Sequence, residues 1–84
     1  MTDSAIAARI VNALEAAANA EAGAATALVS VTIDVLKRAD AGAITTSVTR
    51  KTRTLVFMSA EFRTDAGERI VTASSVHKVL GHAD

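Results

Sequence analysis

The segment at residues 5–22 has helical periodicity, and it constrains the fold of this chain more than any other feature. Ile6, Ile10 and Leu14 recur every four residues, which places them on one face of a helix for about four turns. Alanine fills most of the other positions, so the helix has a high intrinsic propensity and is thin enough for a curved sheet to approach it closely. We therefore expect one helix that buries a single apolar face against a sheet.

Both ends of this helix carry recognisable signals. Asp3 or Ser4 is expected to cap the free N–H groups of the first turn. Gly23 follows the last periodic residue, at the position where a left-handed residue commonly ends a helix. The helix is therefore expected to end just before Gly23.

The rest of the chain alternates between apolar and polar residues, which is typical of strands. Four strands are expected, at residues 25–38, 43–52, 55–65 and 69–80. A turn at 39–42 predicts that the first two strands form an antiparallel hairpin, and reversals at 52–54 and 65–68 add the others. The expected sheet is an antiparallel meander.

The alternation also predicts which residues share a face. In the first strand, one face is expected to contain Ala27, Val29, Val31, Ile33 and Val35, and the other Leu28, Ser30, Thr32 and Asp34. Residues 55–58 are apolar on both faces, which predicts a central strand or a strand covered by another subunit.

The length and the net charge of the chain limit the number of domains and the kinds of partner that we expect. The 84 residues are expected to form one domain, residues 1–84, and a domain of this size buries only about 60–65% of its unfolded surface. Self-association as a dimer or tetramer is therefore expected. The zero net charge argues against nucleic-acid binding, which depends on an excess of Lys and Arg.

Charged residues also interrupt the apolar N-terminal segment. Asp3 precedes it, and Arg9 and Glu15 lie within it, so we expect neither a secretory signal nor a membrane span. The expected location is the cytoplasm.

Two short motifs carry a family resemblance. Residues 34–42, DVLKRADAG, are similar to a strand end with an aspartate, a bulky residue and Arg-Pro-Ala before a Gly turn, here without the proline. Residues 65–67, DAG, precede a small-residue strand at 72–74. With the order of the elements, these motifs resemble the hotdog-fold thioesterases of the phenylacetate-degradation and 4-hydroxybenzoyl-CoA type. The resemblance implies a hotdog-like α+β fold, in which one N-terminal helix packs on a four-stranded antiparallel sheet.

The resemblance also implies a catalytic residue. Residues 12–17, NALEAA, match the part of the helix in which this family carries its carboxylate, so Glu15 is the candidate, as a nucleophile or as a base for water. Alternatively, Glu15 is a solvated helix residue. If Glu15 is in a site, we expect it to be at least half buried at a subunit interface, in a groove that ends near Arg50, Arg53 or Lys78.

Basic residues gather near the ends of several expected strands. Antiparallel pairing brings Arg50, Lys51 and Arg53 to the same end of the sheet as His77 and Lys78, and takes Lys37 and Arg38 to the other end. The resemblance implies that Arg50, Lys51, Arg53 and Lys78 meet the phosphates of an acyl-CoA ligand. The alternative is that they are solvated strand ends, which discourage aggregation through sheet edges.

Other candidate sites have less support. His77 shares a face with Ala73 and Ser75, and a set of Ser74, His77 and Asp34 has no nucleophile elbow around its serine. His77 and His82 do not have the spacing of metal ligands, so no metal and no cofactor are expected.

Two functions remain open at this point. The first is a thioesterase that acts on an acyl-CoA. The second is a non-catalytic binding or structural module, because the further N-terminal strand and the His-Gly-Gly segment of the family have no counterpart in residues 1–4.

Overall fold

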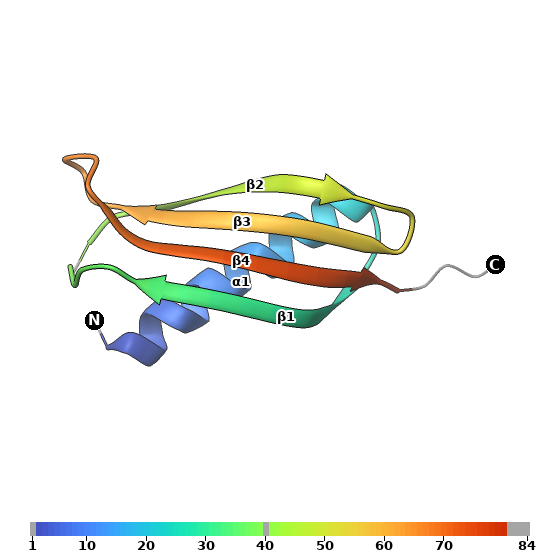
Figure 1. Ribbon diagram of the computed structural model, residues 1–84, viewed down its shortest axis with the longest axis horizontal. Helices are drawn as coiled ribbons and strands as arrows, with labels where there is room; N and C mark the ends of the chain where they lie inside the picture. The colour runs from blue at the N-terminus through green and yellow to red at the C-terminus, as the bar shows by residue number, and fades with distance from the viewer. Residues whose placement is uncertain (1, 40, 81–84) are drawn as a thin grey trace.

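One helix packs against one face of a four-stranded antiparallel sheet in the computed structural model, which describes residues 2–39 and 41–80 (Figure 1). The elements are α1 (Asp3–Ala22), β1 (Thr26–Val35), β2 (Ala43–Lys51), β3 (Leu55–Arg63) and β4 (Arg69–Val79). We call the side of the sheet that packs on α1 the helix face, and the other side the open face. This arrangement confirms the expected α+β architecture.

The apolar stripe of α1 is the centre of the core. Ile6, Ile10, Leu14 and Ala18 are each at most 1% exposed, as the four-residue spacing predicts. Gly23 ends the helix with a left-handed φ of 65°, and its N–H donates to the carbonyl of Asn19.

The N-terminal cap differs from the prediction. The cap is Thr2, whose Oγ1 accepts a hydrogen bond from the N–H of Ala5 at 3.2 Å, and not Asp3 or Ser4. The carboxylate of Asp3 instead accepts two hydrogen bonds from the Arg38 guanidinium, at 2.7 and 3.0 Å. A negative charge in the first turn still favours the helix.

The strand order is β1-β4-β3-β2, so the predicted hairpin between the first two strands is wrong. Strands β2, β3 and β4 form the expected meander, but β1 pairs with β4. After β1, the N–H groups of Leu36 and Lys37 donate to the carbonyl of Ile70, so the chain continues beside β4 before it crosses to the far edge. The crossing passes the start of α1, where Arg38 binds Asp3.

The faces of β1 follow the predicted alternation only in part. Val31 and Ile33 pack against the core, but Val29 is 60% and Val35 is 42% exposed. Val29 is exposed because the pairing register shifts at this point: Leu28 pairs with His77 and Ser30 with Val76, which leaves Val29 outside the pairing. Val35 is at the end of the strand.

The core lies between α1 and the two central strands. On the helix face, β3 contributes Val56, Met58, Ala60 and Phe62, and β4 contributes Val71, Ala73 and Val79. Of the two alternatives for residues 55–58, a central strand is confirmed, because β3 lies between β2 and β4, and cover by another subunit stays a prediction. In the part of the chain that the structure describes, no helix is both long and apolar enough to cross a bilayer.

Candidate functional site

One row of residues crosses the sheet beneath the C-terminal half of α1. Lys51 pairs with Val56, Val56 with His77, and His77 with Leu28. Val56 and His77 are fully buried, so this row belongs to the helix face. The row therefore runs from Lys51, the last residue of β2, into the core.

Glu15 lies in α1 directly after the buried Leu14 and is partly buried. Its negative charge raises the pKa of His77, although desolvation is the larger effect and lowers that pKa overall. Whether Glu15 lies at a subunit interface stays a prediction.

Four basic residues, Arg50, Lys51, Arg53 and Lys78, lie at one end of the sheet, and we call this group the basic end. Lys37 and Arg38 lie at the opposite end, where they pair with Glu68 and Asp3. The predicted separation of the two groups along the strands is therefore confirmed. Binding of phosphates by the basic end stays a prediction.

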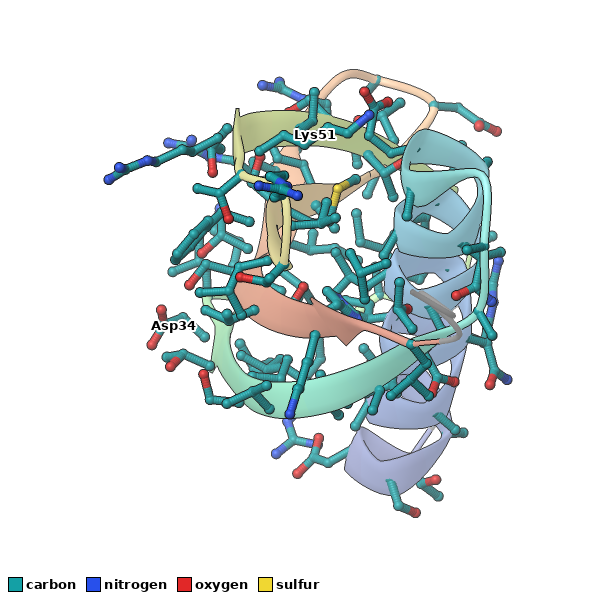
Figure 2. All side chains as sticks on the ribbon, turned by 90° about the vertical axis from the view of Figure 1, so that its right-hand side faces the viewer. Asp34 and Lys51 are labelled. Carbon is teal, nitrogen blue, oxygen red and sulfur yellow. The ribbon has the colours of Figure 1, made fainter. Side chains whose placement is uncertain are left out.

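The basic end is divided between the two faces. Lys51 lies on the helix face, and its Nζ donates to the backbone carbonyl of Glu21 near the end of α1, at 2.7 Å (Figure 2). Arg50 and Lys78 lie on the open face, beside Phe57 and Leu55. The Arg50 guanidinium is 6.0 Å from the centre of the Phe57 ring. Any phosphate that meets all of them must reach around the end of the sheet.

The histidine of the helix face has a buried hydroxyl partner. The Oγ of Ser75 is 2.7 Å from the Nε2 of His77, and Ser75 is 4% exposed. Asp34 and Ser74 point to the open face, where Asp34 pairs with Thr72 (Figure 2). The set of Ser74, His77 and Asp34 is therefore not assembled, whereas the two-residue alternation did place Ser75 beside His77.

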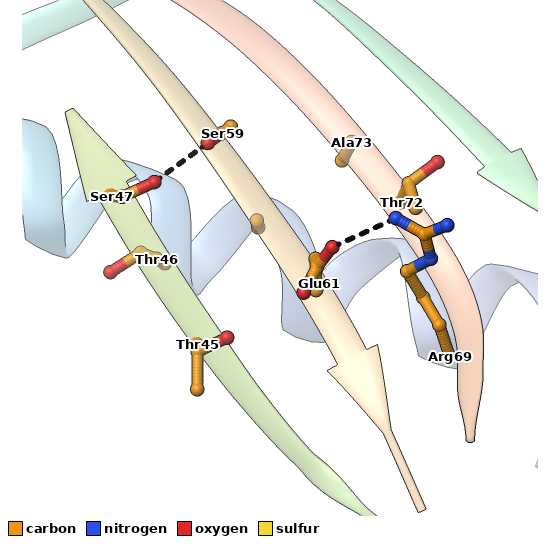
Figure 3. A pocket seen from close by; sticks show the side chains of 9 residues that line it. Thr45, Thr46, Ser47, Ser59, Glu61, Arg69, Thr72 and Ala73 are labelled. Carbon is orange, nitrogen blue, oxygen red and sulfur yellow. Dashed lines mark hydrogen bonds and ion pairs between the residues drawn. The ribbon is translucent and has the colours of Figure 1, made fainter. Parts of the chain in front are cut away.

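The open face carries a groove that the sequence analysis missed. It has a volume of about 530 Å³, and Figure 3 shows its polar side chains on β2, β3 and β4. The hydroxyls of Ser47 and Ser59 are 2.8 Å apart, while Glu61 accepts hydrogen bonds from Arg63 and Arg69. These two arginines hold the pKa of Glu61 below its ordinary value. This groove could have been predicted only from the pairing register of β2 and β3, because that register is what brings Ser47 opposite Ser59.

This groove is not the one expected beside Glu15. It is lined by Thr45, Thr46, Ser47, Ser59, Ala60, Glu61, Arg69, Thr72 and Ala73, which are remote from the basic end along the strands. A charge-paired carboxylate among hydroxyls is suited to polar contacts. The groove has neither the apolar lining that an acyl chain needs nor the free basic groups that the phosphates of CoA need.

Comparison with known proteins supports the fold. No family model matches the chain, and no curated protein matches it by sequence. A crystal structure of the BH2602 protein from Bacillus halodurans, solved with CoA, superposes with a TM-score of 0.62 at 16% identity. The match covers 67% of this chain and 41% of the Bacillus halodurans chain. The fold of this chain is therefore hotdog-like, as the resemblance implies.

Proposed function

We propose that residues 1–84 act as a hotdog-like domain that binds an acyl-CoA thioester in the cytoplasm and hydrolyses it. Glu15 is the catalytic carboxylate in this proposal, and the basic end meets the phosphates of CoA. The proposal extends to this chain the ligand that the Bacillus halodurans structure contains.

The observation that carries the proposal is the position of Glu15 relative to the basic end. Glu15 lies in the C-terminal half of α1, and Lys51 donates to the carbonyl of Glu21, six residues further along the same helix, or about 9 Å at 1.5 Å per residue. A carboxylate and a group of cations therefore occupy the same half of the molecule. Such an arrangement suits a ligand with a reactive thioester at one end and anionic phosphates at the other.

The chemistry asked of Glu15 is ordinary for a carboxylate. As a nucleophile it attacks the thioester carbonyl, forms an acyl anhydride and releases the CoA thiolate, and water then hydrolyses the anhydride. As a general base it removes a proton from a water molecule that attacks the same carbonyl. Partial burial beside the core favours either role, because a dry environment strengthens the interaction of the carboxylate with the reacting atoms.

The first test measures CoA binding by calorimetry. We expect the double variant Arg50→Ala/Arg53→Ala to weaken binding by at least about tenfold, which corresponds to about 1.4 kcal/mol. The double variant Lys37→Ala/Arg38→Ala is the matched control, because it removes the same charge from the opposite end of the sheet. Equal losses in both variants would show that the basic end has no special role.

The second test separates the enzyme from the non-catalytic module. A panel of acyl-CoA thioesters is incubated with the protein, and hydrolysis that Glu15→Gln abolishes supports the thioesterase. Binding without hydrolysis supports the non-catalytic binding module. Absence of both binding and hydrolysis would overturn the proposal.

A further inference from the structure

The edge of the sheet formed by β1 is open and carries a single charge. Among the described residues, β1 pairs with β4 on one side and with no strand on the other. Asp34 is the only charged residue from Thr26 to Val35. The outward N–H and C=O groups of β1 are therefore available to an extended segment of another chain.

The same edge carries two apolar pairs at similar distances from Thr32. Leu28 and Val29, the first apolar pair, precede Thr32 in the sequence. Val35 and Leu36, the second apolar pair, follow it. All four side chains are exposed. An antiparallel strand of the same sequence, centred on Thr32, would bring the first pair of each copy beside the second pair of the other.

We propose that β1 pairs with β1 of a second copy of this chain, antiparallel and about a twofold axis at Thr32. In this register Thr32 faces Thr32 of the second copy, and Ser30 faces Asp34 of the second copy. The two sheets then form one continuous sheet across the axis. The pairing does not rest on the proposed function.

The register agrees with the faces of the sheet. Opposed residues of an antiparallel pair lie on the same face. Ser30, Thr32 and Asp34 lie on the open face, and a serine hydroxyl is a suitable donor to the carboxylate of Asp34. Val31 and Ile33 pack against the core on the helix face, and they face each other across the axis.

The bulge at Val29 brings the apolar pairs into the same agreement. Val29 has no partner in β4, so it is an extra residue of β1. Leu28 and Val29 together therefore oppose Val35 of the second copy. Leu28 pairs with His77 and Val35 with Val71, which places both side chains on the helix face.

Neighbouring registers lose the apolar match. An axis at Val31 would place Val35 opposite Thr26, which leaves the second apolar pair without an apolar partner. An axis at Ile33 would place the first apolar pair opposite the ammonium group of Lys37. An axis between two residues would place side chains of the helix face opposite side chains of the open face, which antiparallel pairing does not produce.

The β2 edge offers no comparable match. Among the described residues of β2, Val48 is the one large apolar side chain that is exposed. Arg50 and Lys51 add two positive charges at the end of this strand. Apolar contact between two copies is therefore a property of the β1 edge.

Pairing at β1 also completes the row that runs from Lys51 beneath α1. That row ends at Leu28, whose side chain is 38% exposed in the single chain. In the proposed register Val35 of the second copy covers it. The half of the molecule that contains Glu15 therefore gains an apolar side chain from the second copy.

Single cysteines test the register, because the chain has no cysteine of its own. Opposed Cα atoms of an antiparallel pair are about 4.5–5.5 Å apart, which a disulfide can span. We expect Thr32→Cys to form a disulfide-linked dimer of twice the chain mass under mild oxidation. Thr32 is exposed, so this substitution leaves the core intact.

Positions away from the axis are the controls. A residue 30 in one copy is about 13 Å along the strands from residue 30 in the other, and the same holds for residue 34. Ser30→Cys alone and Asp34→Cys alone should therefore stay uncrosslinked, whereas a mixture of these two variants should form the linked dimer. Thr46→Cys on the β2 edge should also stay uncrosslinked. Failure of Thr32→Cys to crosslink, or faster crosslinking of Ser30→Cys with itself, would overturn the register.

A second measurement uses the wild-type chain, so it needs no variant to fold. Isotope-filtered nuclear magnetic resonance of mixed ¹³C-labelled and unlabelled copies detects contacts between copies. We expect contacts of Val31 in one copy with Ile33 in the other. Contacts from β2 instead, or no contacts between copies, would overturn the pairing. Because no CoA is added, failure of this inference and failure of the proposed function are distinguishable.

Discussion

Because His77 is buried, the stability of the folded protein depends on pH. Desolvation lowers its folded-state pKa below the ordinary value of 6.5, and the charge of Glu15 offsets only part of this effect. Above the ordinary pKa, His77 is neutral in both the folded and the unfolded chain. As the pH falls through that value, the unfolded chain takes up the proton first, so the free energy of unfolding decreases until the folded-state pKa is passed.

We therefore predict that the free energy of unfolding falls between about pH 7 and pH 5 in the wild-type protein. His77→Gln should have a flatter profile in this interval, because it removes the group that titrates. Urea denaturation at a series of pH values checks this prediction. Parallel profiles for the two proteins would show that His77 does not titrate between the folded and unfolded states as described.

Single residues also show how far sequence patterns reach. The two-residue period placed His77 on the same face as Ser75, and the structure confirms this. The bond between them depends on how α1 covers that face, which no local pattern contains. Likewise, Asp3 has the right chemistry for a cap, but a distant arginine, Arg38, takes its carboxylate and leaves the cap to Thr2.

Among the elements, the helix was predictable and the strand order was not. The stripe of α1 is a local property, since each apolar position follows the last by one turn. The turns after β2 and β3 are also local: Thr52 accepts from Leu55 through its side chain, and Gly67 adopts a φ of 87°. The connection after β1 has no such tight turn, and its path depends on pairing with residues far along the chain.

Shortening a buried side chain in the apolar stripe of α1 should lower the free energy of unfolding. We predict that Leu14→Ala lowers the free energy of unfolding by about 2–5 kcal/mol, because Leu14 is 1% exposed and its removal leaves a cavity against the sheet. The exposed Asn12 is the control on the same helix, and Asn12→Ala should change stability by less than about 0.5 kcal/mol. A loss below about 1 kcal/mol for Leu14→Ala would mean that α1 is not the central element of the core.

Gly42, just before β2, has a different constraint. A Cβ atom there would lie 2.3 Å from the carbonyl oxygen of Arg63 and 2.5 Å from the Phe62 ring. Gly23 has open space around it but a φ of 65°, so Gly23→Ala should cost about 1 kcal/mol. We predict that Gly42→Ala costs more than Gly23→Ala, at about 2 kcal/mol or above, and denaturant titration of both variants gives the order. The reverse order would show that the chain before β2 packs less tightly against β3.

At the scale of the whole molecule, both edges of the sheet are open in the single chain. The edge formed by β1 is apolar, with Leu28, Val29 and Val35 between 38% and 60% exposed, and Leu36 follows at 53%. Exposed apolar edge strands pair readily with another chain. The core is small and contains one of the two phenylalanines of the chain, Phe62, and this small size adds to the advantage of association.

We predict that the chain forms a dimer or tetramer through the β1 edge. Light scattering at micromolar concentration should give a mass above that of one chain, and Val29→Lys should shift it toward the monomer. The control is Thr46→Lys on the β2 edge, which should leave the mass unchanged. If the wild-type protein has the mass of a monomer, or if Thr46→Lys lowers the mass and Val29→Lys does not, the chains do not associate through the β1 edge.

The position of CoA on the chain tests the central claim most directly. A titration of the ¹⁵N-labelled protein with CoA, followed by backbone amide signals, maps the ligand without any assumption about catalysis. We predict that the amides of Arg50, Arg53 and Lys78 shift most, together with those of α1 around Glu15. Shifts confined to the groove of the open face, around Ser47, Glu61 and Thr72, or no shifts at saturating CoA, would contradict the account.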